Sequence, residues 1–174
     1  MVDNKIKTEE LFRLLNDTTA KFFQLVASFG KEEINAKPQA GSWSAAQVAE
    51  HVMLSNRDVT IQLLKAGKTC DREPDAGIEK IRSIFLNFDK KLNSPDFILP
   101  TKEMYDRQQL ISALKRSIFE LINAAHQKDL FEIIHHAIFG EITRFETLYF
   151  VVYHTQRHIH QLRKIQTATP EQIQ

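Results

Sequence analysis

The sequence predicts an all-α four-helix bundle with a long crossover between its second and third helices. The chain has 174 residues, which is enough for one domain with a sizeable core. It contains only five Gly and five Pro, and so few breakers favour long helices over many short strands. Four long stretches carry apolar residues at three- and four-residue steps, the period of one helix face. We therefore expect a single domain that spans residues 1–174.

The first helix is expected to run from about Glu9 to Phe29. Thr8 can cap it, and Glu10 adds negative charge at the positive end of the helix dipole. Gly30 follows directly and suits a C-terminal stop. The predicted apolar face consists of Leu11, Leu14, Leu15, Phe22, Leu25, Val26 and Phe29.

The second helix has a strong start signal at Ser44. Ser44 and Gln47 have the spacing of a capping box, in which each side chain bonds the backbone N–H of the other residue. Trp43 and Val48 flank this cap and can form a hydrophobic staple. We expect the helix to continue to about Lys65.

Two further long helices are expected in the second half of the chain. The third covers about residues 106–126. The fourth begins with a second capping box, formed by Thr143 and Glu146, and continues to about Gln166.

Two connecting segments are less regular. Residues 69–101 form the crossover, and the apolar spacing within residues 77–92 predicts a short accessory helix there. Residues 128–142 are apolar enough to pack against the bundle, and we expect a short helix in this segment as well.

Composition and charge exclude several classes of protein. Lys and Arg total 23 against 22 Asp and Glu, so a net charge of +1 gives no electrostatic basis for binding nucleic acid. No segment approaches the roughly 20 uninterrupted apolar residues of a membrane span, and the amino end does not resemble a secretory signal. Cys70 is the single cysteine, which fits a reducing cytoplasm. It lies in a predicted loop with no histidine beside it, so we expect an incidental role for it rather than that of a nucleophile.

His154 and His158 are the informative pair among seven histidines. They are four residues apart on the predicted fourth helix, so their side chains lie on one face about one turn apart. That spacing lets two imidazoles reach a single metal ion. Val151, Leu162 and Ile165 share the face, which indicates that the pair points inward.

A third ligand has to come from another helix, and His51 is the best candidate because it lies two turns into the second helix. Three histidines leave a coordination position open, which is the catalytic arrangement, whereas structural zinc sites usually have four protein ligands. Asp58 lies further along the same side of that helix. It is either a proton acceptor beside the metal or an ordinary hydrogen-bonded polar residue.

The other histidines are expected to play lesser parts. A pair with this spacing also arises by chance in a His-rich chain, so a packing role for the histidines stays open. His160 points to the other side of its helix and is a poor ligand. His126, His135 and His136 are expected at the surface or in packing.

Two parts of the chain together resemble the DinB-like (YfiT-like) family. Residues 43–51, Trp-Ser-Ala-Ala-Gln-Val-Ala-Glu-His, resemble the start of the second helix in that family. Residues 139–146 and 154–162 resemble its closing helix. The segments come in the order of the family and roughly at its separation. The likeness covers essentially the whole chain and is loosest over residues 69–101.

The resemblance implies a divalent metal ion held by three histidines, which fall on His51, His154 and His158. Nickel or zinc is the expected ion, and iron is an alternative. Members of the family are often dimers, so the resemblance also implies a homodimer. Family members with known chemistry include transferases and isomerases that use a low-molecular-weight thiol, and others are described as metal-dependent hydrolases.

Three hypotheses for the function follow. The first is a cytoplasmic metal-dependent enzyme that acts on a small molecule, either as a thiol S-transferase or as a hydrolase. No further motif in the chain matches a characterised thiol-binding pocket, so the reaction stays open. The second is a non-catalytic metal-binding or stress-response module. The third is a helical interaction protein without a metal, because residues 145–153 are apolar nearly all round and need cover from the bundle or from a partner chain.

Overall fold

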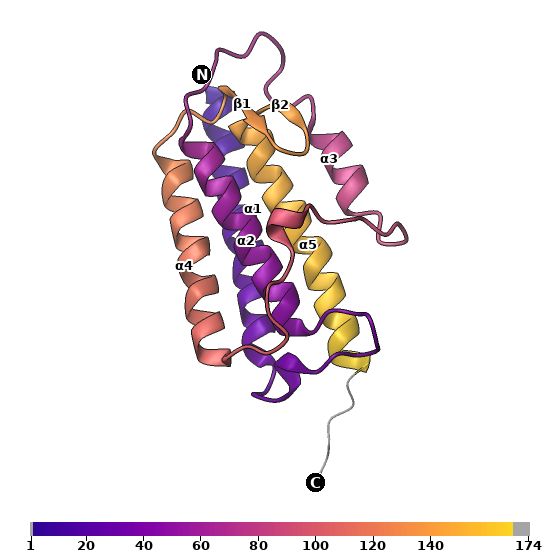
Figure 1. Ribbon diagram of the computed structural model, residues 1–174. Helices are drawn as coiled ribbons and strands as arrows, with labels where there is room; N and C mark the ends of the chain where they lie inside the picture. Colours follow the sequence, from indigo (N-terminus) through magenta and orange to yellow (C-terminus); the bar gives the residue numbers. More distant parts are fainter. Residues whose placement is uncertain (1, 169–174) are drawn as a thin grey trace.

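Four long helices form the core of the protein, whose computed structural model describes residues 2–168. They are α1 (Val2–Ser28), α2 (Ala45–Leu64), α4 (Arg107–His126) and α5 (Arg144–Ala168) (Figure 1). Helix α1 packs mainly on α5, and α2 packs mainly on α4. Since α2 and α4 run in the same direction, the chain has to return along the bundle between them. The predicted four-helix bundle with a long crossover is confirmed.

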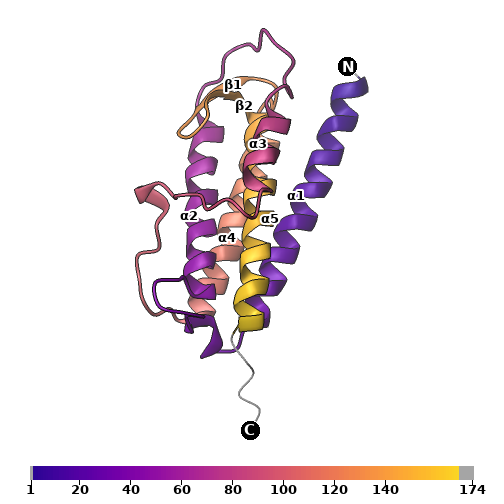
Figure 2. The same ribbon diagram turned by 90° about the vertical axis from the view of Figure 1, so that its right-hand side faces the viewer.

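Three short helical elements and one hairpin complete the fold. The 3₁₀ turn η1 (Glu33–Asn35) follows α1, and the crossover contains helix α3 (Ile78–Phe85) and the 3₁₀ turn η2 (Asp96–Ile98). Figure 2 shows the crossover running over the side of the bundle formed by α2 and α5. This placement brings η2 into contact with α2, where Ile98 of η2 lies beside His51.

Helix α1 begins earlier than the sequence predicts. It starts at Val2, and the expected start at Glu9 is wrong. Thr8 does not cap the helix, because its hydroxyl donates to the carbonyl of Asn4 at 2.8 Å within the second turn. No Gly or Pro occurs between Val2 and Glu9, so nothing stops the helix from extending by two turns.

Both predicted capping boxes are confirmed. Ser44 Oγ accepts from Gln47 N at 3.3 Å, and Gln47 Oε1 accepts from Ser44 N at 3.1 Å. Thr143 Oγ1 accepts from Glu146 N at 3.1 Å, and Glu146 Oε2 accepts from Thr143 N at 2.8 Å. Each box satisfies two backbone donors at a buried helix start, so the starts of α2 and α5 are fixed by local sequence.

The segment between α4 and α5 is a β-hairpin, and the predicted short helix there is wrong. Strands β1 (Ile133–His136) and β2 (Gly140–Thr143) pair antiparallel, with His136 opposite Gly140. Gly140 has φ = 70°, a conformation that glycine adopts without steric cost. The hairpin lies across one end of the bundle (Figure 1).

The accessory helix is shorter than the apolar spacing predicts. Helix α3 ends at Phe85, and Leu86 already has φ = −92° and ψ = 1°. Phe88 therefore leaves the predicted buried face and remains 41% exposed. The extra apolar residues in this stretch belong to the wall of a pocket rather than to the helix core.

The apolar face of α5 is covered largely by the chain itself. Phe145, Leu148, Val151 and Val152 are each 2% exposed or less. The prediction of a homodimer therefore rests on the family resemblance and no longer on the apolar character of this helix. No helix among residues 2–168 is long and apolar enough to cross a membrane.

Candidate metal centre

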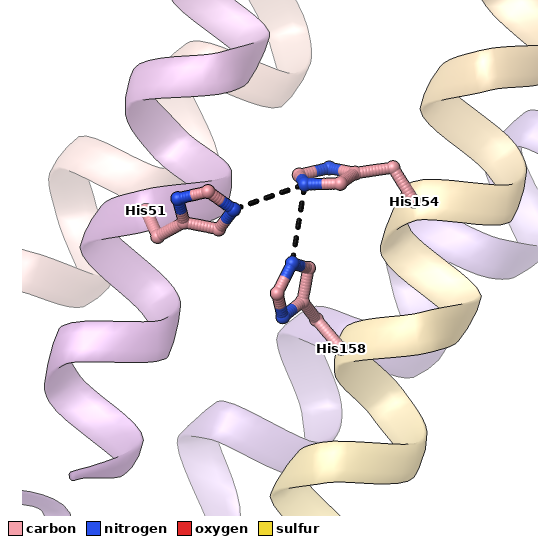
Figure 3. Close-up of side chains that lie close together, drawn as sticks. All are labelled: His51, His154 and His158. Atoms are coloured by element: carbon pink, nitrogen blue, oxygen red, sulfur yellow. Dashed lines mark hydrogen bonds between the residues drawn. The ribbon is translucent and has the colours of Figure 1, made fainter. Parts of the chain in front are cut away.

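The fold brings the three predicted histidines together, although His51 lies 103 residues before His154 in the sequence. His51 projects from α2, and His154 and His158 project from successive turns of α5 (Figure 3). The Nε2 atom of His154 lies 3.0 Å from Nε2 of His51 and 3.1 Å from Nε2 of His158. One nitrogen from each ring falls within 4.8 Å of the others, so the triad is a compact set of three nitrogen donors.

The hydrogen bonds at the far side of two rings fix which nitrogen carries the proton. Nδ1 of His51 lies 2.8 Å from the carbonyl oxygen of Ile98. Because a carbonyl only accepts, this Nδ1 carries the hydrogen, and Nε2 of the neutral ring keeps a free lone pair. Nδ1 of His158 lies 2.8 Å from Oε1 of Gln161, which has the same consequence. Both outer rings therefore present a lone pair to the centre of the triad.

Burial keeps the triad in its neutral form. His51, His154 and His158 are only 1%, 5% and 7% exposed. Desolvation lowers the pKa of His51, and it lowers the pKa of His158 to about 3 with a further contribution from the nearby His51. Desolvation and the two neighbouring rings also hold the pKa of His154 well below its ordinary value. Neutral imidazole is the form that binds a metal ion.

The crossover is held against α2 by a buried carboxylate next to His51. Glu50 is 6% exposed and accepts hydrogen bonds from Thr101 N at 2.7 Å, Thr101 Oγ1 at 3.0 Å and Tyr105 Oη at 2.6 Å. Thr101 follows three residues after Ile98, whose carbonyl orients the His51 ring. Glu50 therefore fixes the segment that orients His51 without touching the triad itself.

Aromatic rings fix the position of His154. Phe150 stacks on its ring at a centroid distance of 5.2 Å, and Phe85 contacts it edge-on at 5.8 Å. Trp43 lies 5.1 Å from His51. The predicted staple residue therefore also borders the triad, a role that the spacing of the cap did not indicate.

The triad opens into a pocket of about 410 Å³, called the inner pocket below. Lys80, Arg157 and residues 93–95 border it together with the three histidines. Its apolar wall is formed by Ile84, Phe85, Leu92, Ile98, Ile138, Phe139 and Phe150. A pocket of this size, apolar with a few convergent polar groups, suits a small-molecule ligand.

Arg157 fastens the loop that follows α3 to the helix that carries two triad members. Its guanidinium donates to the carbonyls of Phe85 at 3.2 Å and Asn87 at 2.8 Å, and also to that of Lys90. All three partners are neutral carbonyls, so the positive charge of Arg157 at the pocket wall is not cancelled by them. Arg157 directly precedes His158 in the sequence, but no local spacing indicates its bonds to these distant carbonyls.

The other histidines lie at the surface or in packing, as the sequence predicts. His135 is exposed, and His136 is buried against Phe139 and Phe150. His126 stacks on Phe12 at 4.0 Å. His160 faces away from the triad and stacks on Phe88, with ring centroids 4.2 Å apart.

Asp58 and Cys70 lie outside the triad. Asp58 accepts a hydrogen bond from Gln62 and borders a separate small cavity with Ser55 and His136. This arrangement matches the interpretation as an ordinary hydrogen-bonded residue. Cys70 donates from Sγ to the carbonyl of Arg72 at 3.1 Å.

The donor set fits a divalent metal ion. His154 Nε2 carries at most one hydrogen, yet it faces the lone pairs of two neighbouring rings, so at most one of the two short contacts is a full hydrogen bond. A divalent cation would use the lone pairs that no hydrogen satisfies. Nitrogens bound to zinc at about 2.0–2.1 Å with tetrahedral angles lie roughly 3.4 Å apart, and two of the three nitrogen pairs here, at 3.0 and 3.1 Å, come close to that separation. Three ligands with an adjoining pocket match the open arrangement of catalytic sites.

Comparisons with solved structures support the fold. TT2238, described as a four-helix bundle protein, superposes with a TM-score of 0.59 at 18% identity, covering 90% of this chain and 98% of that one. YfiT from Bacillus subtilis is described as a probable metal-dependent hydrolase with an unusual four-helix bundle topology. It superposes with a TM-score of 0.59 at 16% identity, covering 91% of this chain and 85% of its own.

Comparisons of sequence identify the family. The chain is 21% identical over 155 residues to the uncharacterized protein YuaE of Bacillus subtilis strain 168, which covers 87% of this chain and 94% of that protein. The family model of the DinB superfamily matches residues 14–162, a stretch that contains all three triad histidines. The chain belongs to the DinB superfamily.

Proposed function

We propose that this protein is a metal-dependent enzyme that holds one divalent ion through His51, His154 and His158. The observation that carries the proposal is the convergence of three Nε2 atoms at the base of the inner pocket, two of them with their lone pairs oriented by Ile98 and Gln161. Zinc and nickel are the ions that we expect, because neutral imidazole suits both.

The chain prepares the site in three ways. Burial keeps the imidazoles neutral, hydrogen bonds at Nδ1 orient two of the rings, and an apolar wall lines the inner pocket beside them. When bound, a divalent cation supplies Lewis acidity, which polarises a carbonyl group and lowers the pKa of a water molecule or thiol beside it. Lys80 and Arg157 add positive charge at the wall, where negative charge develops on the substrate.

Hydrolysis of an ester or amide is the first candidate reaction. It agrees with the description of YfiT, whose fold this chain shares, as a probable metal-dependent hydrolase. Under this proposal the apolar wall receives the acyl group or the leaving group of a small substrate.

Transfer of a low-molecular-weight thiol to an electrophile is the second candidate. It is favoured by the lining of the inner pocket, because none of the described residues that border it is an Asp or Glu. Metal-dependent hydrolases commonly place a carboxylate beside the bound water to accept its proton, and the described lining has none. A thiol, with an ordinary pKa near 8.5, loses its proton more readily than free water and depends less on a neighbouring base.

A paired assay tests the proposal and separates the two reactions. The zinc- or nickel-loaded protein is incubated with a panel of aryl esters and anilides, and in parallel with cysteine and 1-chloro-2,4-dinitrobenzene. Ester or anilide turnover without thiol supports hydrolysis, and metal-dependent formation of the thioether supports transfer. His154→Ala should abolish either activity, whereas His135→Ala, at an exposed histidine outside the triad, should leave it unchanged.

Two outcomes would contradict an enzymatic function. Equal activity in the His154→Ala and His135→Ala variants would show that the triad is not the site of reaction. Metal uptake without turnover on any of these substrates, combined with a large rise in melting temperature, would favour the alternative of a non-catalytic metal-binding module.

A further inference from the structure

A second pocket lies next to the inner one and is larger, at about 680 Å³. We call it the outer pocket. It shares residues 92–94, Arg157 and His158 with the inner pocket, so these residues form a partition between the two. His158 borders both spaces, which places the outer pocket directly beside the triad.

The outer pocket is bordered by positively charged groups. Lys91, Arg157 and Lys164 line it together with His160, and none of its described lining residues is acidic. Lys91 and Lys164 form no ion pair with another residue in the described part of the chain. The carboxylate of Asp89 acts on His160 from outside this lining.

The positive charge here is local, because the chain as a whole has a net charge of only +1. Arg157 donates its hydrogen bonds to neutral carbonyls, so its positive charge adds to those of Lys91 and Lys164. A concave surface lined by one sign of charge raises the local concentration of ions of the opposite sign.

The remaining lining gives the outer pocket a flat apolar side. Phe88 stacks on His160 with an interplanar angle of 15°, and Trp43 borders the space nearer to His51. Gln161 and Asn93 supply neutral polar groups. The exposure of Phe88, which has no role in the helical core, is explained if its ring serves as part of a binding surface.

We infer that the outer pocket binds the carboxylate or phosphate group of a small molecule that extends past His158 toward the triad. This inference rests on the proposed function for the direction of the molecule, and on the charges of the outer pocket for its chemical class. Lys91 and Lys164 provide the charge that attracts the anion, and the partition at residues 92–94 separates that charged group from the reacting group.

Trp43 provides a direct test, because it is the only tryptophan in the chain and it borders the outer pocket. Its fluorescence is quenched with iodide, an anion, and separately with neutral acrylamide, at constant ionic strength and without added metal. The Lys91→Gln/Lys164→Gln double variant is compared with Lys21→Gln/Lys115→Gln, which removes two exposed lysines that line neither pocket.

The expected result is selective. Iodide quenching should fall by about twofold or more in the Lys91→Gln/Lys164→Gln variant and stay unchanged in the control variant, because the local anion concentration depends on nearby charge. Acrylamide quenching should be equal in all three proteins, which also shows that Trp43 remains in the same environment. Equal iodide quenching in the wild type and the Lys91→Gln/Lys164→Gln variant would overturn the inference.

Titration calorimetry with inorganic phosphate and with succinate then distinguishes the anion. Binding of phosphate alone or of succinate alone assigns the pocket to that class, and binding of both assigns it to anions in general. Binding of either probe must be lost in the Lys91→Gln/Lys164→Gln variant. If the wild type binds neither probe, the inference is overturned. Failure of the proposed function is a different result, namely that the wild-type protein takes up no zinc or nickel while its anion binding persists.

Discussion

Helix α5 contributes to two polar clusters, and they differ in how fully their groups are paired. The first, near the hairpin, is the arginine–glutamate cluster of Arg72, Glu132, Arg144 and Glu146. The second, two turns further along, is the histidine triad. The triad is buried, and so are Arg144 and Glu146, whereas their partners Glu132 and Arg72 are partly exposed. The first cluster joins opposite charges, and the second joins three groups of the same kind.

The arginine–glutamate cluster is complete. Glu146 receives two hydrogen bonds from Arg72, at 2.7 and 2.6 Å, and others from Gly77 N at 2.6 Å and Thr143 N at 2.8 Å. Arg144 donates to Glu132 and to three backbone carbonyls, those of Leu63, Lys65 and Asp129. A buried cluster that satisfies its own members stabilises one arrangement of the chain and leaves nothing for a ligand.

The triad is incomplete by comparison, since its lone pairs converge without enough hydrogens to share between them. The two clusters on α5 therefore have different roles. Pairing within the chain indicates a structural role, and convergence of like donors beside a pocket indicates a site for something else.

Removal of Arg144 should cause the largest loss of stability. Arg144→Ala leaves Glu132 without its guanidinium partner and three carbonyls without donors, so we expect the free energy of unfolding to fall by about 3–5 kcal/mol. Urea denaturation of the metal-free protein measures it. Arg163→Ala, at an exposed position of the same helix, should cost less than about 0.5 kcal/mol. Equal losses in the two variants would show that the arginine–glutamate cluster does not stabilise the fold.

Zinc should stabilise the protein through the triad alone. At a free concentration 100 times the dissociation constant, binding adds about 2.7 kcal/mol, which raises the melting temperature by roughly 5–10 °C. Differential scanning calorimetry should show this rise in the wild type and in His135→Ala, but not in His154→Ala. A rise that survives in His154→Ala would place the metal elsewhere.

The acceptor behind His158 should affect metal affinity without being a ligand. Gln161→Ala removes the group that orients the His158 ring, so the dissociation constant for zinc should rise by about 10- to 100-fold. Competition with a chelating dye measures the constant. Gln108→Ala, on the exposed side of α4, serves as the control. An unchanged affinity in Gln161→Ala would mean that this hydrogen bond does not prepare the triad.

The two clusters should respond to acid in different ranges. Burial lowers the pKa of His158 to about 3, so the folded state disfavours a proton that the unfolded chain binds near pH 6.5. The contribution of neutral His158 to the stability of the metal-free protein is therefore fully present above pH 6.5 and is lost as the pH falls toward 3. Between pH 6.5 and 5.5, this histidine accounts for a loss of about 1 kcal/mol, which His158→Gln should remove.

Glu146 contributes to stability through its charged form, whereas His158 contributes through its neutral form. Burial alone would raise its pKa, but the hydrogen bonds from Arg72, Thr143 and Gly77 outweigh that effect and lower it below 4.5. Its contribution is present above pH 4.5 and is lost only in stronger acid. Denaturant titrations at several pH values separate the two ranges, and identical profiles for the wild type and His158→Gln would contradict the assignment of the upper range.

Local sequence was sufficient for the four long helices, apart from the start of α1, and for part of the site. Capping boxes act over three residues, and the pair of histidines acts over four, so both are visible as spacing. Gln161 also lies within one helical turn of His158 and could have been identified in the same way.

The rest depends on contacts between distant residues. Ile98 reaches His51 across 47 residues, through a carbonyl that carries no side-chain signal. The hairpin strands have four residues each, too few to show an alternating pattern against the helical background. Glu146 appears in the sequence only as a capping residue, while its ion pair with Arg72 spans 74 residues and depends on the completed fold.

Metal stoichiometry measures directly whether the triad holds one ion. The purified, chelator-treated protein is dialysed against zinc or nickel, and the bound metal per chain is measured by inductively coupled plasma mass spectrometry. We predict one ion per chain for the wild type and for His135→Ala, and almost none for His51→Ala, His154→Ala and His158→Ala. No bound metal in the wild type, or equal uptake by the three triad variants, would contradict the account.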